Sequence, residues 1–198
     1  MKNEFLEFRK NALQGGGITT PLCADYRRMW SACHDDKEKL MKLALMCQSA
    51  PYLATFFNKG KCVSKEYVKR EFSDFINGRV LRDCDGVDGF TYGMFFDAPT
   101  GFKINIDVCQ ILYCNNTDVE IEKTKCPRLY VSNDSNINIS LDGYNSITIY
   151  LFDDSVINID SCDDTCNVKV YRYSKDAKVN IGKFCLGEVK VFDKELRI

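Results

Sequence analysis

The first part of the chain carries apolar residues at the spacing of short amphipathic helices. One predicted helix face has apolar residues four, three, one and three positions apart: Leu22, Tyr26, Met29, Trp30 and Cys33. Positions that recur at i, i+3 and i+4 are typical of a helix side that packs on other helices. The pattern therefore predicts a small helical bundle over residues 1–78.

The predicted helices begin and end at residues that favour helix termini. Ser, Thr, Asp and Asn side chains accept hydrogen bonds from the first free N–H groups of a helix, and glycine ends a helix readily. The predicted starts are Asn3, Thr20, Asp35 or Asp36, and Ser64. The predicted stops are 15–17 and 77–78, and a further short helix is expected over 51–57.

Strict alternation of apolar and polar residues replaces helical spacing after Gly78. Residues 79–96 predict a hairpin with its turn at 83–86, because two alternating runs flank an Asp- and Gly-rich segment. Further strands are predicted at 102–108 and 119–121. We interpret residues 79–125 as a β transition segment.

Residues 126–198 contain a repeat of about 21 residues. One strand type has Asp, a small residue, any residue, Ile or Val, Asn and Ile, at 134–139, 154–159 and 176–181. A second, aliphatic strand type recurs at 129–131, 147–149, 168–170 and 189–191. Two strands in each repeat indicate a β-solenoid, in which every coil adds one strand to each of two sheets. The predicted fold class is α+β, a helical bundle followed by a two-strands-per-coil solenoid, rather than a Greek-key sandwich.

The alternation within each coil predicts which side chains face the core. We expect one buried column of aliphatic residues at Ile139, Ile149, Ile159, Val170 and Ile181. The asparagines between them should point outward and stack on one another, at Asn138, Asn158 and Asn180. The Asp and small-residue pairs that open each repeat should form tight corners.

Charge is spread unevenly along a nearly neutral chain. The 198 residues have a formal net charge of −1, which excludes a global attraction to nucleic acid or anionic lipid. Residues 126–165, however, carry one basic and seven acidic side chains, and residues 166–198 carry eight basic and four acidic ones. An acidic block of this kind indicates contact with a cationic protein surface, including one that normally holds nucleic acid.

Two features of the repeat are candidates for that contact. The first is a group of carboxylates in one or two loops: Asp153, Asp154, Asp160, Asp163 and Asp164. The second is an aromatic stripe of residues 21 positions apart: Tyr150, Tyr171 and Phe192. Solvated turns or a calcium site are the alternatives for the carboxylates, and a structural stack is the alternative for the rings.

Eleven cysteines and a single histidine, His34, limit the chemistry. The cysteines are odd in number and scattered, without the close pairs that structural zinc prefers. We interpret them as free thiols buried in a reducing compartment and expect no metal or cofactor, while zinc and a chance disulfide remain alternatives. With one histidine and no nucleophile or phosphate-binding motif, the sequence predicts no enzyme.

Several motifs of the chain resemble those of one group of proteins. They are Leu22, Cys23, Tyr26 and Trp30 at their spacing, the segment 72–78, and the Tyr173, Ala177 and Val179 pattern. This pattern resembles small proteins, without an assigned activity, that phages, prophages and mobile elements of gut Bacteroidota encode. The resemblance implies a phage-associated context and supplies no catalytic residue.

These observations favour a non-enzymatic protein-binding module. We expect a phage-encoded accessory factor that binds or inhibits a host or defence protein, with a homo-oligomer left open. No apolar run is long enough for a membrane span or a signal peptide, so we expect the protein in the cytoplasm of the bacterial host. A virion structural or adhesion component is the alternative, and a carbohydrate-active enzyme is a third hypothesis.

Overall fold

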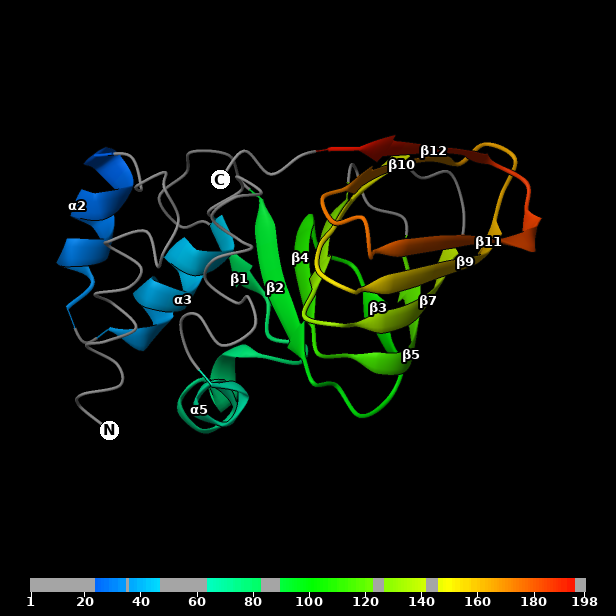
Figure 1. Ribbon diagram of the computed structural model, residues 1–198. Helices are drawn as coiled ribbons and strands as arrows, with labels where there is room; N and C mark the ends of the chain where they lie inside the picture. The colour runs from blue at the N-terminus through cyan, green and yellow to red at the C-terminus, as the bar shows by residue number, and fades with distance from the viewer. Residues whose placement is uncertain are drawn as a thin grey trace.

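A β-solenoid makes up most of the protein, with short helices beside it (Figure 1). The computed structural model describes residues 24–34, 36–46, 64–82, 90–122, 127–141 and 146–194. Its helices are α2 (Ala24–Ala32), α3 (Lys37–Met46), α5 (Lys65–Glu71) and the 3₁₀ turn η1 (Ser73–Phe75). Its strands are β1 (Leu81–Arg82), β2 (Thr91–Phe96), β3 (Phe102–Ile104), β4 (Val108–Leu112), β5 (Asn115–Ile121), β6 (Arg128–Ser132), β7 (Asn136–Leu141), β8 (Ser146–Leu151), β9 (Val156–Cys162), β10 (Asn167–Arg172), β11 (Lys178–Cys185) and β12 (Glu188–Asp193).

The strands form two sheets that the chain visits in turn. Sheet A has the order β1-β2-β4-β6-β8-β10-β12, and sheet B has the order β11-β9-β7-β5-β3. All strand pairs are parallel except β1 with β2. Equivalent positions of successive repeats lie side by side: Ile139 is next to Ile159, and Ile147 is next to Val168. The predicted solenoid, with two strands in each coil, is confirmed.

The parallel stacking begins before the residues in which the repeat is visible. Strands β2 and β4 pair in parallel, as do β3 and β5, so residues 91–121 already belong to coils. Pairing between backbones does not require the Ile-Asn-Ile pattern, which explains why coils form where that pattern is absent. The predicted hairpin is confirmed by the antiparallel pair of Leu81 with Tyr92, and its predicted turn at 83–86 lies outside the described residues.

Aliphatic residues fill the interior between the two sheets. Ile139, Ile149, Ile159 and Val170 are fully buried, as the alternation predicts. The prediction is wrong for Ile181, which is 54% exposed. Strand β11 is the edge of sheet B, so within the described ranges no further coil covers this inward position.

The helices cover the outer face of sheet A at its N-terminal coils. Leu40, Leu43 and Leu45 of α3 belong to a buried cluster with Tyr92 and Phe96 of β2. Figure 1 shows α2 and α3 on the side of the solenoid where β1 and β2 lie. The helices therefore pack beside the first coils, and the later strands of sheet A extend beyond them.

The helix termini agree with the sequence where they can be compared. The Ser64 hydroxyl accepts a hydrogen bond from the Tyr67 N–H, and the Asp36 carboxylate accepts one from the Lys39 N–H. Asn77 and Gly78 both have positive φ and end the helical region. The predicted helices over 3–13 and 51–57 lie outside the described residues, and the bundle as a whole stays a prediction.

One ion-pair cluster ties α5 to the first coil. Lys65 and Lys69 both bind the carboxylate of Asp97, with N–O distances of 2.6 Å. Burial alone would raise the pKa of Asp97, but hydrogen bonds from the two lysines outweigh it and lower the pKa. Asp97 follows β2, so α5 is held at the corner where the first coil turns towards sheet B.

The asparagine ladder runs along the outside of sheet B. Asn180 donates to Asn158, Asn158 to Asn138, and Asn138 to Asp118, with N–O distances of 2.7, 2.9 and 2.8 Å. The predicted outward stack is confirmed, and it begins one coil earlier, on an aspartate. Asn138 and Asn158 each donate to the coil before and accept from the coil after, so the ladder helps to fix the register of successive coils.

A column of small buried residues lies at the corners between sheet A and sheet B. Ser135, Ser155 and Ala177 occupy equivalent positions and are at most 1% exposed. The Ser135 hydroxyl donates to the Ser132 carbonyl and accepts from the Cys114 N–H. The Ser155 hydroxyl, among the described residues, is buried without a hydrogen-bond partner.

The two serines of this column should therefore respond differently to alanine. We expect Ser155→Ala to leave the free energy of unfolding unchanged or raise it. The buried Ser155 hydroxyl makes no hydrogen bond, and the equivalent residue one coil later, Ala177, is already alanine. Ser135→Ala should lower it by about 1 kcal/mol, because two hydrogen bonds are lost. Urea denaturation of the two variants compares them, and equal losses would contradict the assignment.

Candidate functional site

An open groove lies on the outer face of sheet B, near the ends of β5, β7 and β9. Its volume is about 800 Å³. Four carboxylates and a single lysine are the charged residues that line it: Lys103, Asp118, Glu120, Asp160 and Asp163. The groove is therefore strongly acidic, although the chain as a whole is nearly neutral.

Small residues in one outward column form the floor of the groove. Strand register places Glu120, Ser140, Ser161 and Phe184 in successive coils at the same height. The two serines leave a hollow between the carboxylate of Glu120 on one side and the Phe184 ring on the other. Register shifts in β9 and β11 accompany this hollow, and such bulges redirect side chains at the edges of sheets.

One wall of the groove is apolar and exposed. Phe184 and Leu186 are 78% and 71% exposed, the highest values among the large hydrophobic residues that the structure describes. Both line the groove, beside Asp160 and Asp163. A surface that combines exposed apolar side chains with carboxylates is typical of a contact for another molecule.

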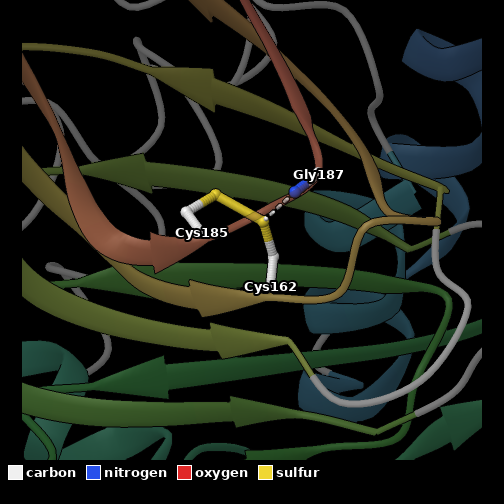
Figure 2. Close-up of a disulfide and its surroundings, with 3 residues drawn as sticks. All are labelled: Cys162, Cys185 and Gly187. Atoms are coloured by element: carbon white, nitrogen blue, oxygen red, sulfur yellow. Dashed lines mark hydrogen bonds between the residues drawn. A yellow bond between two sulfur atoms is a disulfide. The ribbon is translucent and has the colours of Figure 1, made fainter.

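A disulfide between Cys162 and Cys185 holds this wall in place. Figure 2 shows the bond joining β9 to β11, with the Gly187 N–H donating to the Cys162 sulfur at 3.3 Å. The Leu186 N–H donates to the Cys162 carbonyl at 2.9 Å. A Cβ on Gly187 would lie 2.5 Å from the Asp163 carbonyl oxygen, so only glycine lets the chain pass so close.

Two of the groove carboxylates already have partners within the protein. The Lys103 ammonium lies 2.8 Å from a Glu120 carboxylate oxygen, and Asp118 accepts from Asn138. The Lys103–Glu120 pair is exposed and contributes little to stability. With Lys103 as the one basic side chain among the four carboxylates of the lining, the groove keeps a net negative charge, and Asp160 and Asp163 place part of it beside the apolar wall.

The structure divides the predicted acidic cluster between two edges of the solenoid. Asp160 and Asp163 line the groove, and Asp164 follows in the same corner, between β9 and β10. Asp153 and Asp154 lie in the corner before β9, at the opposite end of that strand from the groove residues Asp160 and Asp163. The Asp153 carboxylate accepts from the Asn133 N–H, which gives it a role in the corner itself.

The aromatic stripe is confirmed as a continuous stack but lies on the other sheet. Ring centroids of Tyr150 and Tyr171 are 5.6 Å apart, and those of Tyr171 and Phe192 are 5.3 Å apart. Tyr130, which the repeat did not predict, extends the stack with its ring centroid 4.6 Å from that of Tyr150. Since these rings belong to the outer face of sheet A, they do not join the carboxylates of sheet B in one site.

The interpretation of all cysteines as free thiols is wrong for the Cys162–Cys185 disulfide. The other cysteines that the structure describes are buried free thiols, at Cys33, Cys109, Cys114 and Cys166. Burial raises the pKa of Cys109 and of Cys114, which keeps both thiols protonated and unreactive. Within the described ranges, no group of three His, Cys, Asp or Glu side chains is placed to hold a metal ion.

No family model, curated protein or solved structure matches the chain. The function of the groove must therefore be argued from its own residues, and the resemblance to phage-encoded proteins stays a prediction. None of the helices in the described part of the chain has the length and hydropathy that a membrane span requires.

Phe184 and Leu186 were not predicted from the sequence as site residues. Their signal is a break in the repeat: Ile159 is followed by Cys162 after two residues, whereas Ile181 is followed by Cys185 after three. The extra residue belongs to the bulge that turns Phe184 outward. The irregular position in the repeat therefore indicates the apolar wall of the groove, which the regular positions do not.

Proposed function

We propose that the protein is a non-enzymatic binding module whose groove takes a basic segment of another protein. One observation carries this proposal. The carboxylates of Asp160 and Asp163 line the same groove as the exposed apolar side chains of Phe184 and Leu186. A cationic side chain of the partner would meet the carboxylates, while an apolar side chain beside it would cover the exposed wall.

The shape of the groove supports a chain segment as its occupant. It is open along the sheet and shallow enough to leave Phe184 largely exposed, so a small molecule would bury little of its surface there. A basic surface that normally holds nucleic acid presents the required charges. In the phage-associated context that the sequence resembles, such a partner would be a host or defence protein.

Charge reversal in the groove should abolish most of this binding. Asp160→Lys with Asp163→Lys should weaken association at least about tenfold, because attraction becomes repulsion at the centre of the contact. The control is Asp154→Lys with Asp176→Lys, which makes the same charge change at exposed corners on the opposite edge. Pull-downs from a bacterial host lysate identify the partner, and calorimetry with the purified partner measures affinity.

The partner itself separates the hypotheses. A single protein that the control variant retains and the groove variant loses supports the proposal, and its affinity for the wild-type chain should fall as salt is raised. Virion proteins in the pull-down would support a structural or adhesion role instead. A partner that both variants retain equally would place the interface outside the groove.

A further inference from the structure

The two ends of the solenoid are built differently. At the first coil, β1 pairs with β2, and the Asn77 side chain bonds to both backbone groups of Phe96. At the last coil, β12 is the edge of sheet A and β11 is the edge of sheet B, each with one neighbour in the described part of the chain. One end is therefore closed on sheet A, and the other presents two strands ready to pair.

Apolar side chains concentrate at the open end. The described residues include seven exposed large hydrophobics, and five of them lie in the last coil: Ile181, Phe184, Leu186, Val191 and Phe192. Ile181 and Val191 occupy inward positions whose equivalents one coil earlier, Ile159 and Val170, are fully buried. The last coil thus leaves the end of the core uncovered.

We propose that a second copy of this chain covers the open end, pairing β12 with β12 and β11 with β11 in antiparallel fashion. A head-to-tail arrangement is disfavoured because β1 and Asn77 already occupy the sheet A edge at the other end. Two identical open ends can meet instead about a two-fold axis normal to the sheets. Such an isologous contact closes on itself and gives a dimer rather than a fibre.

The residues of the last coil are complementary to themselves about such an axis. In sheet A, an axis through Val191 sets Val191 against its own copy and Glu188 opposite Lys194 of the second copy. In sheet B, an axis through Asn180 sets Val179 opposite Ile181 of the second copy and continues the asparagine ladder into it. In this register Val191, Val179 and Ile181 face apolar residues on the inside, where Asp193 also lies opposite Val189 of the second copy. The opposite charges of Glu188 and Lys194 meet on the outside.

The size of the contact indicates a weak dimer. Strands of this length are about 20 Å long and the sheets are about 10 Å apart, so the end of the core covers about 200 Å² in each copy, well below the roughly 800 Å² per partner of a standard interface. Backbone hydrogen bonds along two edges and continuity of the apolar core supply the stability. The contact uses the inward-facing Ile181 and Val191, whereas the groove variant changes Asp160 and Asp163, so different substitutions test the dimer and the proposed function.

Sedimentation velocity of the full chain over a wide concentration range tests the proposal. The wild-type protein should pass from monomer to dimer, and Val191→Lys should raise the dissociation constant at least about tenfold by placing a charge in the apolar contact. Val80→Lys is the matched control, because Val80 and Val191 are both 42% exposed and only Val191 lies at the open end. Circular dichroism of each variant verifies that it is folded.

Charge exchange tests the arrangement of the strands. Glu188→Lys and Lys194→Glu should each weaken the dimer, and the double variant should restore it, because the opposite charges again face each other. A wild-type chain that stays monomeric, or a dimer that Val191→Lys leaves intact, would overturn the proposal. The Asp160 and Asp163 groove variant should dimerise normally, so failure of either proposal leaves the other standing.

Discussion

Replacing Ile159 by alanine is expected to lower the free energy of unfolding by about 2–5 kcal/mol. Ile159 is fully buried between the sheets and pairs with Ile139 and Ile181 in the neighbouring coils. Because the core is enclosed on both faces, the removed methyl groups leave a cavity that the coils above and below cannot fill.

Ile181→Ala provides a control at the same repeat position. Ile181 is 54% exposed, so the same substitution should cost less than about 1 kcal/mol when measured at concentrations that keep the chain monomeric. Urea denaturation of both variants gives the comparison. Equal losses at 159 and 181 would show that the last coil is covered in solution or that the core is not continuous.

Reduction of the Cys162–Cys185 disulfide is expected to lower the free energy of unfolding by about 3 kcal/mol, as cross-links of this loop length do. The two cysteines are 23 residues apart in sequence, and the bond joins the last strand of sheet B to the strand before it. Without it, β11 keeps its backbone pairing and the Asn180–Asn158 hydrogen bond to β9, and the unfolded chain loses the constraint of the cross-link.

Thermal denaturation with and without reductant measures this effect. A variant with Cys162→Ala and Cys185→Ala should be less stable than the oxidised protein. Its thermal denaturation should be the same with and without reductant. Thiol titration of the denatured wild-type protein should find two more free thiols after reduction than before. An unchanged thiol count would show that the pair is not bonded in solution.

The parts of the fold that repeat could be predicted from the sequence, because their side chains alternate under a strict constraint. At Ile159 and Asn158, one side chain must enter a narrow core and the next must leave it, so the pattern reveals the strand. At Ile181 the same pattern holds although the position is exposed. A repeat shows which way a side chain points and carries no information on whether another coil covers it.

The candidate site was harder to predict because sequence distance along a solenoid is a poor measure of spatial distance. Asp153 and Asp163 are ten positions apart, yet strand β9 carries the chain from one edge of the molecule to the other between them. Residues about one coil apart, such as Cys162 and Cys185, are in contact instead. Residues that form a site in a solenoid should therefore be sought at positions one repeat apart in sequence rather than within a single loop.

Because the two ends of the solenoid differ, unfolding is expected to begin at one of them. Each coil contacts chiefly the coils before and after it, so the solenoid can unfold one coil at a time from an end. The first coil is held by β1 and the helices, whereas the last coil has a neighbour on one side only. We therefore expect fraying of the monomer to start at β11 and β12, with amide protons there exchanging before those of β4 and β6. The disulfide fastens the solenoid where this opening would begin.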